Sequence, residues 1–117
     1  ALTPEAAGIL GRKELALMKD GAFLINTARG ALVDETALID EIKSGRLRAG
    51  LDVYAEEPLP LDSELRELPG CVLLPHVGSA TERTRRAMFE LALGNLFAGL
   101  QGRDLPARLG TALATKS

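Results

Sequence analysis

The sequence is poor in the residues on which several classes of site depend. It contains one cysteine, Cys71, in 117 residues, which excludes an intrachain disulfide and a metal site built from several cysteines. Aromatic residues make up 3 % of the chain and tryptophan is absent, so a surface that stacks nucleic-acid bases is not expected. No apolar run approaches the roughly 18 residues that span a bilayer. We therefore expect a cytoplasmic protein without a metal site, a nucleic-acid partner or a membrane partner.

The charged residues are nearly balanced. The chain carries 14 Lys and Arg against 16 Asp and Glu, a formal net charge of −2, whereas a nucleic-acid or anionic-membrane surface requires an excess of basic residues. Apolar residues make up 46 % of the chain, which is enough for the core of one ordinary domain. Because the sequence opens with Ala1 rather than Met, we expect it to be a piece of a longer protein.

Three short apolar runs predict β-strands. They cover residues 22–26, 49–53 and 71–75, and none of them alternates polar with apolar side chains. Continuous apolar runs of this length are typical of strands that are buried on both faces, as in a parallel sheet. The segments between the runs are long enough for the crossovers that parallel strands require.

Helix signals separate and follow these runs. Apolar side chains indicate a helix over residues 12–19, and a second helix over residues 34–43 begins with a capping aspartate. The longest helix is expected at about residues 80–101. A capping box opens it, with Ser79 as the N-cap and Glu82 as the third helical residue.

The order of these elements predicts an α/β fold. Strands that alternate with helices favour a doubly wound parallel sheet with right-handed crossovers. Three strands are fewer than such a sheet usually has, so the chain is expected to form its second half, three strands plus flanking helices.

Charged residues and the single histidine follow the predicted strands. Arg29 comes shortly after the first run, Asp52 lies near the end of the second with Glu57 beyond it, and His76 follows the third. Open parallel sheets bind ligands outside the carboxyl ends of their strands. We therefore expect these four side chains to meet at one edge of the sheet.

This set suits the reduction of a carbonyl group beside a carboxylate. Arg29 can hold the carboxylate of a 2-keto acid through two charge-assisted hydrogen bonds. His76 can give a proton to the carbonyl oxygen, and a neighbouring Glu57 favours the imidazolium and orients its ring. No side chain supplies hydride, so a nicotinamide cofactor is required, and Asp52 could accept a hydrogen bond from its carboxamide.

Three motifs resemble the signatures of the D-isomer-specific 2-hydroxyacid dehydrogenases, in the family's order and spacing. They are Asn-Thr-Ala-Arg-Gly at 26–30, Gly-Leu-Asp-Val-Tyr-Ala-Glu-Glu-Pro at 50–58, and Leu-Pro-His-Val-Gly-Ser-Ala-Thr at 74–81. The segment after Pro58 and the residues after His76 are most similar to the glyoxylate/hydroxypyruvate reductase branch.

The resemblance implies roles for individual residues. His76 corresponds to the catalytic acid and base, Glu57, which directly precedes the proline, to its partner, and Arg29 to the substrate clamp, so Arg29 and His76 both touch substrate. The substrate implied is a small 2-keto acid such as glyoxylate or hydroxypyruvate. The cofactor contacts implied are Ala1, Thr27, Ala28, Asp52, Gly78 and Ser79.

The resemblance also implies a domain organisation. Residues 1–102 correspond to the C-terminal part of a Rossmann-type NAD(P)-binding domain, including the long return helix, and residues 103–117 form a tail. The family's Gly-x-Gly-x-x-Gly turn and the residue that reads the ribose 2′ group are absent from this sequence, so the cofactor is NAD or NADP. Intact members are commonly homodimers.

Two further hypotheses stay open. The substrate domain and most of the cofactor site lie outside the sequence, so the isolated chain is expected to be inactive or very weak, and it could be an inactive truncated module. A cofactor-sensing dimeric scaffold, like the related corepressors, would keep the same residues without turnover. An assay of the longer protein with glyoxylate or hydroxypyruvate and NAD(P)H separates these hypotheses.

Overall fold

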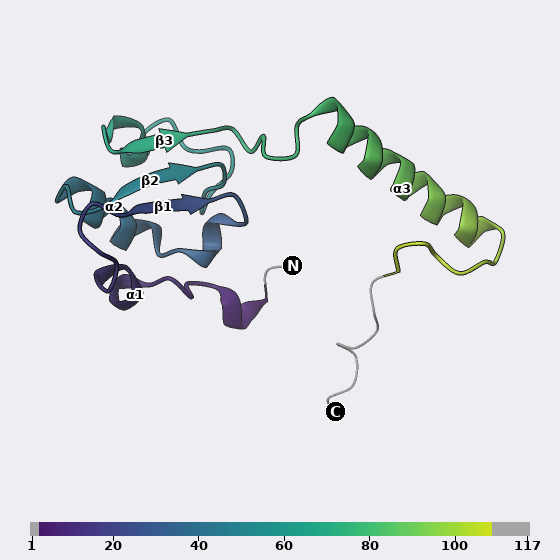
Figure 1. Cartoon of the computed structure of the whole chain (residues 1–117), viewed down its shortest axis with the longest axis horizontal. Coiled ribbons are helices and arrows are strands. Elements are labelled where there is room, and N and C mark those ends of the chain that lie inside the picture. The colour runs from purple at the N-terminus through teal and green to yellow at the C-terminus, as the bar shows by residue number, and fades with distance from the viewer. Residues whose placement is uncertain (1–2, 109–117) are drawn as a thin grey trace. The chain divides into compact units, whose positions relative to one another are not determined.

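The computed structural model describes residues 3–108 of the chain (Figure 1). Its contacts divide the chain into two compact units, Ala1–Gly78 and Ser79–Ser117. Among the described residues, no helix has both the length and the apolar character needed to cross a membrane. The assignment of residues 1–102 to one domain stays a prediction, and the two units are described separately below.

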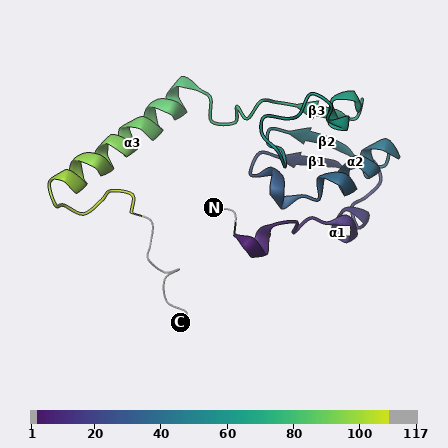
Figure 2. The same ribbon diagram turned by 180° about the vertical axis from the view of Figure 1, so that it is seen from behind.

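The first unit is built on a parallel sheet. The strands β1 (Phe23–Asn26), β2 (Arg48–Leu51) and β3 (Cys71–Leu73) lie in that order, with Phe23 beside Arg48 and Ala49 beside Cys71. The helices α1 (Arg12–Ala16) and α2 (Glu35–Lys43) and three short 3-10 helices (Pro4–Ala6, Gly30–Leu32 and Glu64–Glu67) connect and flank the strands (Figure 2). The α/β class and the three parallel strands predicted from the sequence are confirmed.

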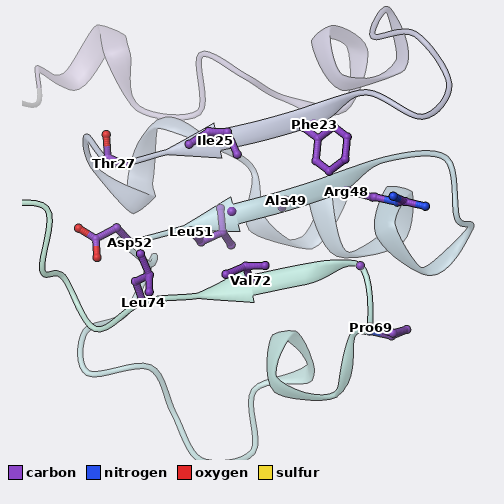
Figure 3. Close-up of a pocket in the computed structure, with 12 residues that line it drawn as sticks. Phe23, Ile25, Thr27, Arg48, Ala49, Leu51, Asp52, Pro69, Val72 and Leu74 are labelled. Carbon is purple, nitrogen blue, oxygen red and sulfur yellow. The ribbon is translucent and has the colours of Figure 1, made fainter.

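The core lies between one face of the sheet and the flanking helices. Leu24 and Leu51 point into it from β1 and β2, and Leu38 of α2 and Leu15 of α1 complete it, all of them buried. The alternate residues of the strands stay exposed. The predicted burial of both faces is therefore found on one face only, because α1 and α2 contribute to the same core. The exposed apolar side chains of the other face are Phe23, Ile25, Val72 and Leu74 (Figure 3).

Side-chain hydrogen bonds act at one end of each α-helix in this unit, at the start of α2 and at the end of α1. The carboxylate of Asp34 accepts a hydrogen bond from Ala37 N at 3.0 Å, which confirms the predicted cap of α2. In contrast, α1 ends at Ala16 rather than Lys19. The guanidinium of Arg46 donates to the carbonyls of Leu15 and Met18, both at 2.6 Å, and so satisfies groups that another helical turn would otherwise use.

The second unit consists of α3 (Glu82–Leu100) and the segment after it. The predicted capping box is shifted: Thr81, not Ser79, is the N-cap, and its hydroxyl accepts from Thr84 N at 3.1 Å. Glu82 is thus the first helical residue rather than the third. After the helix, Ala107 N donates to Asn95 Oδ1 at 2.9 Å, which fixes the chain beside α3.

Gly30 allows the loop after β1 to contact the loop after β2. A Cβ atom at this position would lie 1.9 Å from the carbonyl carbon and oxygen of Tyr54 and 2.5 Å from Ala55 N. These are main-chain atoms, so no side-chain rotation can relieve the clash. Gly30 therefore brings the segment that carries Arg29 against the segment that leads to Glu57.

We expect Gly30→Ala to lower the free energy of unfolding by about 3 kcal/mol, the upper end of what overpacking costs, because the backbone itself must move. Chemical denaturation of the chain measures this. Gly94→Ala in α3 is the matched control: its Cβ would meet Pro106 Cγ at an ordinary 3.9 Å, and alanine favours a helix over glycine by about 1 kcal/mol. Equal losses in the two variants would contradict the close contact at Gly30.

Candidate functional site

The predicted site residues of the first unit gather at the carboxyl ends of the three strands. Figure 3 shows Thr27, Asp52 and Leu74 at the same end of the sheet, each just beyond its strand. His76 lies two residues after Leu74, and Arg29 lies two residues after Thr27. The sheet therefore brings together segments that are far apart in the sequence.

His76 and Glu57 form a direct pair. His76 Nδ1 lies 2.6 Å from Glu57 Oε2, and both side chains are partly exposed, at 46 % and 36 %. A carboxylate can only accept, so Nδ1 carries the proton of this hydrogen bond and Nε2 is left for a reacting group. The predicted proximity of these two residues is confirmed by this contact.

The carboxylate of Glu57 is held in its ionised form. The hydrogen bond from His76 is the largest of the effects that lower the pKa of Glu57, and the backbone N–H of Tyr54, 3.2 Å from Oε1, adds to it. The charge of Arg29 also lowers the pKa of Glu57, as the smallest of these effects.

Asp52 holds the turn that carries His76. It is the first residue after β2 rather than part of the strand, and it is 2 % exposed. Its Oδ1 accepts from Val77 N and its Oδ2 from Gly78 N, each at 2.7 Å. These charge-assisted bonds offset the cost of burying the carboxylate. They also hold the two residues that follow His76. The backbone of His76 itself has a φ of 55°, which is uncommon for a residue other than glycine.

Tyr54 connects the Glu57 loop to the end of β3. Its hydroxyl donates to the carbonyl of Leu74 at 2.7 Å, two residues before His76. Its backbone N–H binds Glu57, as described above, and the carboxylate of Glu35 accepts from Ala55 N at 3.0 Å. Burial raises the pKa of the Tyr54 hydroxyl. The sequence motif contained Tyr54, but no local pattern indicated that it bridges two loops.

Asn26 organises the loop after β1. Its Nδ2 donates to the carbonyl of Arg29 at 2.9 Å, and its Oδ1 accepts from Ala28 N at 3.0 Å. The side chain of Arg29 is exposed beyond this loop, where Nη1 donates to the carbonyl of Ala28 at 2.6 Å. Asn26 was not among the predicted site residues. The available signal was a polar residue at an inward-facing position of an apolar strand.

The predicted cofactor residues do not all lie in the same part of the structure. Thr27 and Ala28 lie in the loop after β1, and Gly78 is held against Asp52, where a Cβ would approach Oδ2 to 3.0 Å. Ser79 begins the second unit. Ala1 lies outside the described residues.

An open cavity covers the exposed face of the sheet and reaches this edge. It measures about 650 Å³, and its lining includes Ile25, Val72, Thr27 and Asp52 (Figure 3). A second cavity of about 510 Å³ is lined by Tyr54 together with Glu57 and His76. The polar groups of the site therefore face cavities large enough for small ligands.

Comparison with known families identifies the first unit. Residues 1–78 match the family model described as "D-isomer specific 2-hydroxyacid dehydrogenase, NAD binding domain". The chain belongs to this family. The resemblance inferred from the three motifs is therefore confirmed, and the open three-stranded sheet is part of the Rossmann-like NAD-binding domain of these enzymes.

The relatives of the chain include named reductases. Glyoxylate/hydroxypyruvate reductase B of Pectobacterium atrosepticum is 52 % identical over 103 residues, which are 87 % of this chain and 32 % of that protein. A crystal structure of a glyoxylate reductase from Paecilomyes thermophila covers 96 % of this chain and 34 % of its own, at 42 % identity and a TM-score of 0.87.

A third relative was crystallised with ligands. The NADPH-dependent glyoxylate/hydroxypyruvate reductase of Sinorhizobium meliloti, solved in complex with NADP and malonate, has a TM-score of 0.86 and 34 % identity, with 92 % of this chain and 34 % of that chain covered. The chain thus spans about a third of the length of the relatives that it matches.

We expect Asp52→Asn to lower the free energy of unfolding by about 1–3 kcal/mol, because an amide replaces one of the two acceptors with an N–H donor that faces Gly78 N. Asp40→Asn is the matched control. Asp40 pairs with Arg12 at 2.7 Å on the surface, where such pairs contribute about 0–1 kcal/mol. Denaturation curves of both variants test this, and a smaller loss for Asp52→Asn than for Asp40→Asn would contradict the role of Asp52.

The pKa of Glu57 is expected to rise toward its ordinary value of 4.5 in His76→Gln, because the largest cause of its lowering is removed. Carboxyl ¹³C shifts of labelled glutamate measure this change. The pKa of Glu41, lowered mainly by Arg46, serves as the internal control and stays unchanged.

The sign of the pH dependence follows from the direction of the shift. A carboxyl whose pKa is lower in the folded state stabilises that state above its unfolded pKa, and this contribution is lost as the pH falls through the folded pKa. The contribution of Glu57 is therefore lost on the acid side and shrinks in His76→Gln. A pKa of Glu57 that is the same in both proteins would show that the ion pair does not form.

Proposed function

We propose that the protein carrying this chain is an NAD(P)-dependent 2-hydroxyacid dehydrogenase that reduces glyoxylate or hydroxypyruvate to the 2-hydroxy acid. The observation that carries the proposal is the contact of 2.6 Å between His76 Nδ1 and Glu57, at the edge of the sheet where Arg29 also lies. The names of the relatives support the choice of substrate, because several are glyoxylate/hydroxypyruvate reductases.

The residues at the edge fit a nicotinamide cofactor. A carboxylate has about four acceptor positions, and Asp52 uses two of them on Val77 N and Gly78 N. It lines the larger cavity, so a further acceptor position can receive an N–H of a carboxamide. Thr27, Ala28 and Gly78 would hold the group together with Asp52, and such a cofactor, when bound, would supply the hydride.

Arg29 binds the carboxylate of the substrate in this proposal. Its guanidinium is exposed, and two of its N–H groups can each donate to one oxygen of a carboxylate. Such a bidentate contact fixes the keto acid in one orientation. The same contact excludes simple aldehydes and ketones, which have no carboxylate. Binding of the acid group thus sets both the position and the class of the substrate.

His76 moves the proton. Glu57 engages Nδ1, so the proton on Nε2 is the one that His76 gives to the keto oxygen. With hydride supplied by a bound cofactor, which would leave in its oxidised form, the products would be the 2-hydroxy acid and a neutral imidazole. The lowered pKa of Glu57 favours its ionised form, in which it accepts the hydrogen bond from Nδ1 of His76. Oxidation of the hydroxy acid runs through the same groups in reverse.

We also propose a cytoplasmic homodimer. A single cysteine suits a reducing compartment, where disulfides are rare. Apolar side chains on α3, among them Phe89 and Phe97 at 64 % and 56 % exposure, offer a surface that a second subunit can cover.

In the full-length protein, we expect His76→Gln to reduce kcat for glyoxylate by about 100-fold or more, the usual contribution of a general acid.

Arg29→Lys is expected to raise KM by at least about tenfold, because lysine cannot form the bidentate contact. Steady-state assays with NADH and with NADPH measure both effects and show which cofactor is used.

Arg85→Lys in α3 is the control for the arginine substitution and should leave both constants unchanged. A kcat of His76→Gln within about threefold of the unsubstituted protein would overturn the proposed chemistry. A full-length protein that binds NAD(P)H without turnover of either keto acid would favour the scaffold hypothesis.

A further inference from the structure

Two buried side chains among residues 3–108 are polar, and both stand at the end of a strand. Asp52 is 2 % exposed and Asn26 is 8 % exposed. Asn26 occupies an inward-facing position of β1, two residues after the buried Leu24, where an apolar side chain would cost less to bury. A polar side chain at such a position requires partners, and the partners of Asn26 are all main-chain groups.

The side chain of Asn26 closes the loop that follows β1. One end accepts from Ala28 N, and the other end donates to the carbonyl of Arg29. The backbone carbonyl of Asn26 also accepts from Asp52 N at 3.0 Å, which joins this loop to the end of β2. The amide offers a donor and an acceptor on two separate atoms, whereas aspartate lacks the donor and alanine lacks both.

Arg29 is consequently fixed from both sides. Asn26 holds its carbonyl and the N–H of the residue before it, and Gly30, the residue after it, contacts the main chain of Tyr54. A long side chain on a fixed backbone samples fewer positions than one on a free loop, so less entropy is lost when the guanidinium binds an anion. Asn26 itself is buried, and both ends of its side chain are engaged by main-chain groups of this loop.

We propose that Asn26 is the positioning residue of the substrate-carboxylate clamp: its two side-chain hydrogen bonds fix the backbone from which Arg29 binds the 2-keto acid. This inference rests on the proposed function and deepens it, because it assigns the affinity for the carboxylate to a buried amide as well as to the guanidinium. Asn26 acts on substrate binding through Arg29, and its loss leaves the His76–Glu57 pair in place.

Binding of oxalate to the full-length protein saturated with NADH or NADPH tests the inference, because oxalate carries the carboxylate but cannot be reduced. Asn26→Ala is expected to weaken oxalate binding by about tenfold and to raise KM for glyoxylate similarly, with kcat within about threefold. Because Thr27 and Ala28 lie in the same loop, the Kd of the cofactor is expected to rise as well, but by a smaller factor than that of oxalate. In the background of Arg29→Ala, the same substitution is expected to have no further effect on oxalate, because the group through which it acts is gone.

Asn95→Ala is the matched control. The side chain of Asn95 also bonds main-chain groups, accepting from Ala107 N and donating to the carbonyl of the same residue, but it lies in the second unit. We expect unchanged oxalate binding in this variant. If Asn26→Ala does not fold by circular dichroism, Asn26→Asp replaces it, since aspartate keeps the size and the acceptor, loses the donor to the carbonyl of Arg29 and adds a negative charge.

The outcomes separate the inference from the proposed function. Unchanged oxalate binding in Asn26→Ala, or equal losses with and without Arg29, overturns the positioning role alone. Unchanged oxalate binding in Arg29→Ala overturns the clamp and with it the proposed function. A loss of cofactor affinity in Asn26→Ala that equals or exceeds the loss of oxalate affinity shows a general loss of structure at the edge and also overturns the inference.

Discussion

The arrangement of the site depends on one buried carboxylate. Asp52 stands at the end of β2 and accepts the amides of Val77 and Gly78, which belong to the loop after β3. These two bonds hold the turn in which His76 adopts a positive φ. Without them, the loop between β3 and α3 would lose the two bonds that hold the residues directly after His76. The residue near the proposed cofactor thus also holds the proposed acid.

Main-chain hydrogen bonds fix the other two loops in the same manner. Asn26 closes the loop that carries Arg29, and Tyr54 joins the loop that carries Glu57 to the end of β3. Each functional side chain therefore projects from a backbone that a neighbouring strand end has fixed. Such a site is organised before a ligand arrives, which is the condition under which hydrogen bonds and charges act most strongly on a reaction.

The sequence predicted the sheet and the contact of Glu57 with His76 because both depend on strong, local signals. Apolar runs indicate strands, and the parallel topology then brings their carboxyl ends to one edge. The prediction that both faces of the sheet are buried was wrong. Whether a face is buried depends on which other elements cover it, and the sequence of a strand does not contain that information. The early end of α1 depends on Arg46, a residue distant in the sequence, and so could not be read from the helix itself.

The roles of Asn26 and Tyr54 were not predictable for a related reason. Their motif places them near the site, but their function lies in side-chain bonds to the main chain of other segments, and the sequence contains no local trace of these bonds. The start of α3 was misplaced by the choice between two hydroxyl residues, Ser79 and Thr81, of which the backbone geometry selects the second.

The most direct test of the account is a crystal structure of the full-length protein with NADH or NADPH and oxalate. The account predicts one carboxylate of oxalate in a bidentate contact with Arg29 and an oxygen of the other carboxylate at about 2.6–3.2 Å from His76 Nε2, while Nδ1 keeps its contact with Glu57. Oxalate bound away from Arg29, or an imidazole turned so that Nε2 faces Glu57, would contradict it.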